Sequence, residues 1–438
     1  MRKIIGILLC ILLITLVQAQ DTVKTYWKNK TLMSVGVKVN DKEQGHWVFY
    51  HFNGAKWTEG EYRDGAKIGI WKVWFDNGSI SQEYNAENGP FKSWYPSGQV
   101  ESQGQFVNRM REGDWVFYHP SGKLYKEVTY HADSVDGHVI EYFDNGGKYF
   151  EGTYKMGALE GYSCWWTRDS LKSMEGPSVN DLQQGVWKYY NDKGGIASTG
   201  NFDAGLQSGE WIYYYDSGSM WKRGGYVDGK RQGKWVAWYE DGKLQREGNF
   251  FNDKENGIWT SYYENGHIQD QGTFKMGVME GKWVGWYENG FQKYAISYKD
   301  NKYNGPYSFW YDNGKMKVRG AYKDDLKDGA WEDYAQNGKI LDKGKYSKDL
   351  KEGKWVFYNV HEIRVREQIF VHNFPNGAFT EYYDNGVKHF QGSFQDHARE
   401  GKWSCWNPEG KLYYSAVYSK GKMIKELYVT DPKAGTPF

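Results

Sequence analysis

Residues 257–280 read GIWTSYYENGHIQDQGTFKMGVME, and residues 281–304 read GKWVGWYENGFQKYAISYKDNKYN. Both segments begin with Gly, which we number as position 0, and both carry an aromatic residue at positions 2 and 5 and Asn-Gly at positions 8 and 9. Asn-Gly between two aromatic-rich runs favours a two-residue type I′ turn. Each segment therefore predicts one β-hairpin.

This pattern continues along the chain from Gly45. The opening glycine recurs every 24 residues, except for one spacing of 20 between Gly69 and Gly89. Position 5 is Trp or Tyr in all sixteen repeats, and position 17 is Tyr or Phe in most of them. A fixed period of this length is the signature of a repeat architecture. We expect an all-β fold, an elongated array of 24-residue β-hairpin repeats that forms a coiled antiparallel sheet.

The turn position also predicts the register of each hairpin. If positions 8 and 9 form the turn, residues whose positions sum to 17 face each other, so Trp259 lies opposite Gly272 and Trp331 opposite Gly344. Such a ring would cover the bare backbone of the strand glycine. Positions 2, 4, 6, 11, 15 and 17 then share one face, the expected core face. The aromatic residue at position 5 falls on the other face unless a bulge intervenes.

The N-terminus differs from the repeats. Arg2 and Lys3 precede an apolar run of 14 residues, and Val17-Gln18-Ala19 is typical of a signal-peptidase site. We expect residues 1–19 to be a signal peptide and the mature protein to be exported, as a periplasmic, cell-surface or secreted protein. A retained membrane anchor is the alternative, although a span needs ~20 apolar residues. No later stretch predicts a transmembrane segment.

The remaining chain divides by its fit to the repeat. We interpret residues 20–44 as a degenerate capping repeat, 45–424 as sixteen hairpin repeats, and 425–438 as a terminal strand and polar tail. Cys164 and Cys405 lie ten repeats apart, which predicts two free thiols in strands.

Charge and motifs exclude several functions. Lys and Arg number 56 against 55 Asp and Glu, and removal of Arg2 and Lys3 leaves 54 against 55, a net charge of −1. We therefore expect no nucleic-acid partner. The histidines do not fall at metal-ligand spacings, and the carboxylates that precede the turns obey the period, as turn-flanking residues do. We expect no catalytic, cofactor or metal site, and no enzyme.

Phe274-Lys-Met-Gly277, followed by Gly281-Lys-Trp283, resembles the core of the MORN-repeat variant. The resemblance extends from residue 45 to about residue 428. It implies a repeat scaffold of the kind found in bacterial exported repeat proteins and in antitoxin-like proteins. Some eukaryotic members are associated with phospholipids and with protein assembly, but for an exported chain of net charge near −1 we do not expect lipid binding.

The position-5 aromatic residues are the candidate contact residues. One interpretation is that they only pack against neighbouring hairpins; the other is that they form a ladder about 10 Å apart, close to the repeat of an extended glycan. The main expectation is a non-enzymatic exported scaffold for protein-protein or cell-surface contacts, with protein or cell-surface polysaccharide as partner. The alternatives are a glycan-binding aromatic ladder and an antitoxin-like protein that neutralises a toxin. The candidates in the most regular stretch are Tyr190, Tyr214, Trp238, Tyr262, Trp286, Trp310 and Tyr334.

Overall fold

The computed structural model describes residues 21–430, and this range contains strands and turns but no helix. Its 39 strands form one sheet, in which neighbours in the sequence pair antiparallel. The described range accordingly has no helix that could cross a membrane. The predicted signal peptide, residues 1–19, and the end of the tail, 431–438, lie outside the described residues. The expected all-β array of antiparallel hairpins is confirmed.

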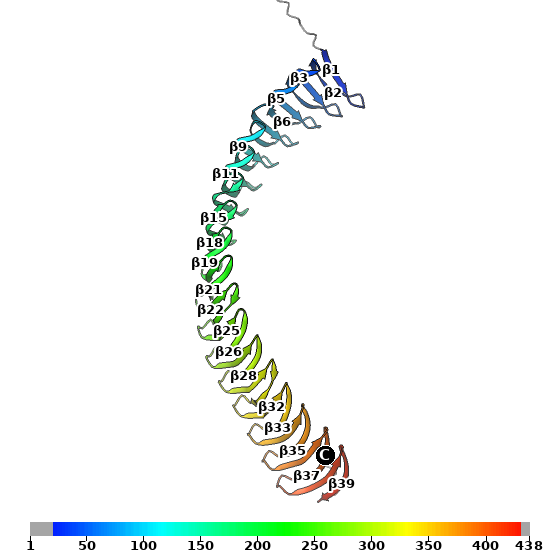
Figure 1. Cartoon of the computed structure of the whole chain (residues 1–438), viewed down its shortest axis with the longest axis vertical. Helices are drawn as coiled ribbons and strands as arrows, with labels where there is room; N and C mark the ends of the chain where they lie inside the picture. Colours follow the sequence, from blue (N-terminus) through cyan, green and yellow to red (C-terminus); the bar gives the residue numbers. More distant parts are fainter. Residues whose placement is uncertain (1–20, 431–438) are drawn as a thin grey trace, which may run out of the picture. The chain divides into compact units, whose positions relative to one another are not determined.

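The chain divides into an N-terminal part, which ends at Leu206, and a C-terminal part, which begins at Gln207. Within each part, hairpins lie beside one another in chain order (Figure 1). The strands up to the boundary are β1 (Asp21–Tyr26), β2 (Leu32–Val39), β3 (Lys42–Tyr50), β4 (Lys56–Arg63), β5 (Ala66–Trp74), β6 (Ile80–Asn85), β7 (Gly89–Trp94), β8 (Val100–Val107), β9 (Met110–Tyr118), β10 (Leu124–His131), β11 (Ser134–Tyr142), β12 (Lys148–Lys155), β13 (Ala158–Leu159), β14 (Gly161–Trp166), β15 (Lys172–Val179), β16 (Leu182–Gln183), β17 (Gly185–Tyr190) and β18 (Ile196–Asp203).

The second set of strands follows the same alternation. These strands are β19 (Leu206–Tyr214), β20 (Met220–Val227), β21 (Lys230–Trp238), β22 (Leu244–Phe251), β23 (Lys254–Glu255), β24 (Gly257–Tyr262), β25 (Ile268–Lys275), β26 (Val278–Trp286), β27 (Gln292–Lys299), β28 (Lys302–Trp310), β29 (Met316–Lys323), β30 (Leu326–Lys327), β31 (Gly329–Tyr334), β32 (Ile340–Ser347), β33 (Leu350–Tyr358), β34 (Arg364–Val371), β35 (Phe374–Tyr382), β36 (Lys388–Gln395), β37 (Ala398–Trp406), β38 (Leu412–Ser419) and β39 (Lys422–Val429).

The register of the hairpins is the predicted one over most of their length. Trp259 pairs with Gly272 and Trp331 with Gly344. Between positions 4 and 5 the register shifts, so that Tyr262 pairs with Ile268 and Gln269 is the extra residue of a bulge. The expectation that position 11 lies on the core face is therefore wrong. The bulge at position 12 pairs position 11 with position 5, so position 11 lies on the same face as position 5.

The Asn-Gly turn is not the predicted type I′ turn. Gly266 alone has a positive φ, 87°, and its amide donates to Tyr263 O at 2.9 Å, while Tyr263 N donates to His267 O at 2.8 Å. This is a three-residue loop, a type I turn followed by a glycine bulge. The two successive positive φ values of a type I′ turn occur at the other end of the repeat, at positions 19 and 20, as in Asp300 (52°) and Asn301 (66°).

The side chain of the turn asparagine stabilises this loop, which also forms where position 8 is Ser217 or Asp241. Asn265 Oδ1 accepts from the backbone N–H of His267 at 2.9 Å, which fixes a turn around the asparagine. Its Nδ2 donates to Glu288 O, in the turn of the next repeat, at 2.9 Å. Asn265 thus bonds both its own turn and the next one, and its own φ is not positive.

The core is a row of tryptophans at position 2. A Cβ on Gly272 would lie 1.9 Å from Trp283 of the next repeat, so the expectation that the ring opposite in register covers the glycine is wrong. Trp283 Nε1 donates to Thr273 O at 3.2 Å, which holds the indole in place. Each such tryptophan joins two repeats. The same stacking occurs at Gly36/Trp47, Gly60/Trp71, Gly104/Trp115, Gly176/Trp187, Gly224/Trp235, Gly248/Trp259, Gly320/Trp331, Gly344/Trp355 and Gly392/Trp403.

Candidate binding surface

Two ladders of hydrogen bonds join the turns of successive repeats. In the first, a side chain at position 6 donates to the carbonyl oxygen at position 5 of the next repeat, as Tyr263 Oη does to Trp286 O at 2.8 Å. In the second, the turn asparagine makes the bond described for Asn265. Each repeat therefore supplies backbone acceptors to the side chains of its predecessor. The other position-6 tyrosines of the first ladder are Tyr95, Tyr215, Tyr239, Tyr287, Tyr311 and Tyr383.

Two histidines replace tyrosine in the first ladder. His51 Nε2 lies 2.9 Å from Trp74 O, and His119 Nε2 lies 3.1 Å from Tyr142 O, so each ring nitrogen bonds the next repeat. Within residues 21–430, no group of three or more His, Cys, Asp or Glu side chains is placed to hold a metal ion.

The predicted contact residues at position 5 are half-buried. All seven, from Tyr190 to Tyr334, have this intermediate exposure. Tyr262 Oη donates to Glu247 of the preceding repeat at 3.0 Å, and Tyr190 Oη donates to Glu175. The Arg223 guanidinium lies 5.6 Å from the ring centroid of Trp238. The row thus contributes to packing between repeats, and ligand binding by it stays a prediction.

A second aromatic set, at position 12, does not follow from the sequence pattern. Trp57 is 45% exposed and lies 6.0 Å from His51, and Tyr125 is 42% exposed and lies 5.0 Å from His119. Position 12 is the extra residue of each bulge, so it projects at a place that strict alternation cannot reveal. The residue type there varies between repeats. Further pairs of positions 6 and 12 are Phe143/Tyr149, Tyr215/Trp221 and Tyr383/His389.

One irregular repeat contains a buried acid. Glu175 of β15 is 5% exposed; Lys172 Nζ donates to it at 2.6 Å, and Tyr190 also donates. Burial favours the protonated form, but hydrogen bonds from Lys172, Tyr190 and Tyr162 outweigh it and hold the pKa of Glu175 at about 2. Cys164 lies directly opposite on β14. Because Tyr190 belongs to the next repeat, this ionised carboxylate joins two repeats.

Cys164 and Cys405, the two cysteines of the described residues, are free, as predicted, and both are buried. Burial raises the pKa of Cys164 to about 11 and that of Cys405 to about 12. A thiol with such a pKa is a poor nucleophile at neutral pH.

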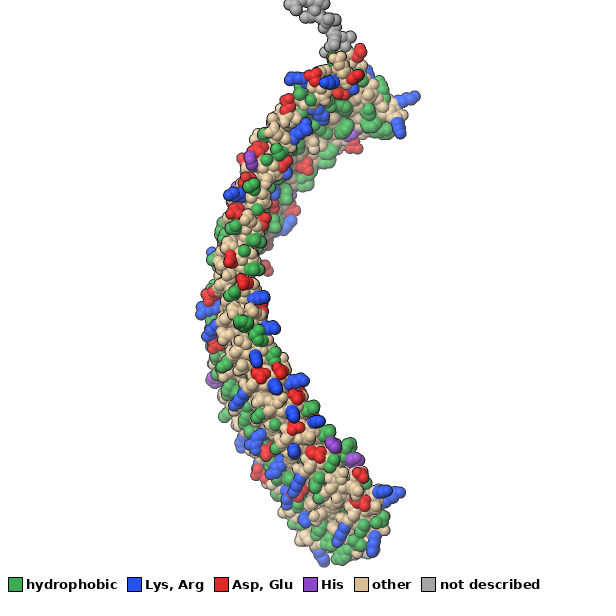
Figure 2. All heavy atoms as spheres, in the orientation of Figure 1, with side chains coloured by type: hydrophobic (Ala, Val, Ile, Leu, Met, Phe, Trp, Pro, Cys, Tyr) green, Lys and Arg blue, Asp and Glu red, His purple; other side chains and the backbone are tan. Residues whose placement is uncertain are grey.

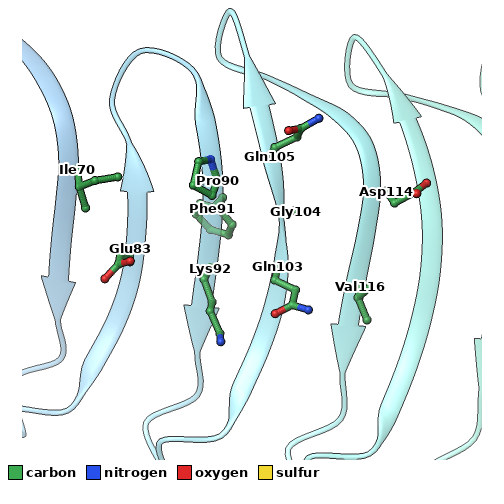
Figure 3. Close-up of a pocket in the computed structure, with 10 residues that line it drawn as sticks. All are labelled: Ile70, Glu83, Pro90, Phe91, Lys92, Gln103, Gly104, Gln105, Asp114 and Val116. Atoms are coloured by element: carbon green, nitrogen blue, oxygen red, sulfur yellow. The ribbon is translucent and has the colours of Figure 1, made fainter.

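A groove of about 490 Å³ lies over β5 to β9, beside the shortened repeat, residues 69–88. Tyr84 and Phe91 occupy the places of the usual glycine and tryptophan, and no type I′ arm separates β6 from β7. Glu83, Lys92 and Gln103 form a row across β6, β7 and β8 on one wall (Figure 3). The lining residues come from β5 to β9, and none of them lies in the turn between β6 and β7.

Charges of both signs are interspersed on the faces in view in Figure 2. Many of them pair across strands, as Lys234 does with Glu247 at 2.9 Å and Lys354 with Glu367 at 3.1 Å. Exposed pairs of this kind contribute little to stability. The residues that depart from the repeat pattern are therefore the chemically distinctive parts of the surface.

Comparison with solved structures gives only distant likenesses. The crystal structure of TcdB2-TccC3-Cdc42 matches at 8% identity and a TM-score of 0.15, over 92% of this chain and 26% of that chain. A structure of the Photorhabdus luminescens Tc holotoxin pore matches at 9% identity and a TM-score of 0.15, over 92% of this chain and 27% of that chain. The chain thus spans about a quarter of these proteins, and likeness at this level carries no argument about function. No curated protein matches the sequence.

The family model of the MORN repeat variant matches the chain six times. The expected resemblance to this repeat is confirmed at that level, whereas the bacterial exported or antitoxin-like subfamily stays a prediction. The matches cover residues 87–108, 111–132, 231–252, 255–276, 303–324 and 375–396.

Proposed function

We propose that this protein is a non-enzymatic, exported scaffold that holds partner proteins at the cell surface. MORN repeats and a sheet of repeated hairpins suggest a protein-interaction scaffold. The single observation that carries the proposal is a division between positions. Trp283 contacts the preceding repeat and Tyr263 and Asn265 bond the next one. Position 12 varies, and it carries exposed rings at Trp57, Tyr125, Tyr149 and Trp221.

That division is what a binding scaffold requires. The repeated contacts fix the backbone, so a partner meets a surface that needs little ordering on binding. Exposed Trp and Tyr supply large contact area at low entropic cost. In the N-terminal part, Trp57, Tyr125 and Tyr149 are the strongest candidates because each is more than two-fifths exposed and is held by a ring at position 6.

The experiment replaces Trp57, Tyr125 or Tyr149 in the full chain by a photo-crosslinking phenylalanine. Cross-linked products from the exported fraction are identified by mass spectrometry, and the N-terminus of the mature protein is sequenced. We expect a protein product that is lost when the two unlabelled aromatic residues are replaced by Ser. Serine is the natural residue at position 12 in Ser81 and Ser173, so these variants are expected to fold.

Serine in place of Phe291, an exposed ring of the C-terminal part, is the matched control. The proposal fails if none of the three sites yields a specific product, or if the mature protein is not exported with an N-terminus near Gln20. A product with an intracellular toxin would instead favour the antitoxin-like alternative. Binding of cell-wall polysaccharide that depends on Trp238, Trp286 and Trp310 would favour the glycan-binding alternative.

A further inference from the structure

A cation-lined cavity lies on the core face of β20, β21 and β22. Lys222, Ala237 and Arg246 are directly opposite one another on these three strands. Position 4 carries a ring in several other repeats, such as Tyr213 and Phe309, but Ala237 has only a methyl group. The missing ring leaves a cavity of about 320 Å³, bordered by Lys222, Tyr226, Arg231, Arg246, Phe250 and Trp259.

The positive charge in this cavity is only partly compensated. Arg231 Nε lies 3.2 Å from Asp253 Oδ1, and Arg246 donates to Glu255 at 2.8 Å. In the described chain, no carboxylate lies within ion-pair distance of Lys222, whose Nζ lies 4.0 Å from the Trp221 ring centroid and 4.6 Å from that of Tyr213. Three cations against two carboxylates leave one net positive charge.

The surroundings of Lys222 disfavour its charged form. Burial first, and then the charge of Arg231, lower the pKa of the Lys222 ammonium. A bound anion would remove this penalty, because an opposite charge within hydrogen-bond reach favours the ionised form. An apolar wall beside Lys222 consists of Phe250 and Trp259. The Arg231 guanidinium lies 4.0 Å from the Phe250 ring centroid, and that of Arg246 lies 4.3 Å from the Trp259 ring centroid.

We propose that this cavity binds an acidic side chain of an extended segment of a partner protein. The inference rests on the proposed scaffold function and names the chemistry of its partner. Lys222 and Arg246 are two strand steps apart, roughly 10 Å. Side chains on one face of an extended peptide recur every ~7 Å, so neighbouring Asp or Glu side chains can reach both cations.

The charge count favours a peptide over a lipid surface or a nucleic acid. Recognition of anionic lipid uses clusters of about 4–8 cations. Binding to nucleic acid neutralises several phosphates at once. One uncompensated cation in a ring-lined cavity fits one or two carboxylates and the apolar stems that carry them.

The test measures fluorescence anisotropy of a fluorescein-labelled hexaglutamate peptide with the full chain. Two variants address charge and space separately. Lys222→Met removes the uncompensated charge, and Ala237→Phe fills the cavity with the side chain that Phe309 has at the same position, leaving all cations in place. We expect each variant to lower affinity at least tenfold. Lys230→Met is the control, at an exposed lysine of β21, the strand that contains Ala237. This variant should change affinity less than twofold.

Three outcomes would overturn the inference. These are absence of hexaglutamate binding by the wild-type chain, an equal loss with Lys230→Met, and retained affinity in a folded Ala237→Phe variant. Binding of phosphatidylserine vesicles that depends on Lys222, without peptide binding, would also overturn it in favour of a lipid headgroup. Cross-linking at position 57 is independent of this cavity, so its success with failure here would refute only the acidic segment.

Discussion

Exchange of Gly272 for valine should destabilise the array through one identifiable contact. Gly272 has an extended backbone, so the cost is one of space. Its added Cβ would lie 1.9, 2.1 and 2.4 Å from Cδ2, Cε2 and Cγ of Trp283, where ordinary contacts are 3.4–4 Å. The indole cannot withdraw easily, since it is 6% exposed and bonded to Thr273 O. We expect a loss of about 3 kcal/mol, the upper end for an overpacked core.

Valine in place of Trp283 should by itself cost a similar amount. It removes most of a buried ring and leaves a cavity, for which large-to-small exchanges of Trp cost about 3–5 kcal/mol when Ala is the replacement. The double variant should be less destabilised than the sum of the singles, by about 2 kcal/mol, because the chain already contains this combination. Val128 and Val139 occupy the same two positions and are 2% and 1% exposed.

The assay is amide hydrogen exchange in β25 and β26, with urea unfolding as a second measure. Exchange reports the local free energy of opening, which suits an array in which each repeat touches mainly its neighbours. The control cycle pairs Gly272→Val with Trp259→Val, since Trp259 is opposite in register but its ring covers Gly248. Additive losses in the Trp283 cycle, or stronger coupling in the Trp259 cycle, would refute the reasoning.

Three further predictions test other contacts. Asn289→Asp keeps the acceptor for the Phe291 amide but removes the donor to Asp312 O, so amide exchange in the turn at residues 311–314 should show about 1 kcal/mol less protection; unchanged protection would contradict the ladder. The pKa of Glu175 is lowered to about 2 from 4.5, so its contribution, on the order of 3 kcal/mol, is present above pH 4.5 and lost as the pH falls towards 2. The fall in urea midpoint between pH 6 and pH 3 should therefore be smaller in Glu175→Gln, and an equal fall would count against this assignment. Cys405, with a pKa of about 12 and no exposed surface, should resist iodoacetamide at pH 8 until the chain is unfolded in urea, and rapid labelling of the folded chain would disprove its burial.

The sequence predicted the hairpin array because the relevant signals are local. The turn dipeptide and the alternation of residues are read within one repeat, and the period is read from the spacing of successive glycines. They were sufficient for the pairing of Trp259 with Gly272, and the separation of Cys164 and Cys405 by ten repeats was sufficient for the free thiols. The local signals did not reveal the turn type, nor that Asn265 donates to a carbonyl oxygen 23 residues later.

The other differences have a similar cause. Which ring covers Gly272 depends on how one hairpin leans on the next, and register within a hairpin does not contain this information. The exposure of Trp57 depends on a bulge that no residue type announces. Even so, one signal was present in the sequence. Each tryptophan at position 2 follows a glycine at position 15 of the repeat before it, and where Val128, Ile296 or Gln368 replaces that glycine, the partner is Val139, Tyr307 or Phe379.

Specificity in such an array has to reside where a repeat can change without disturbing its neighbours. Positions 2, 6, 8 and 15 are constrained because another repeat contacts them, as Trp283 contacts Gly272. Position 12 is free because it is the surplus residue of a bulge, and position 4 tolerates Ala237 as well as Phe309 because a missing ring there creates a cavity rather than a clash. A partner that reads position 12 and the cavity beside Lys222 would therefore distinguish repeats whose backbone pairing is the same. It follows that exchanging residues at positions 4, 12 and 13 between repeats should move a binding site along the array while leaving the ladders intact.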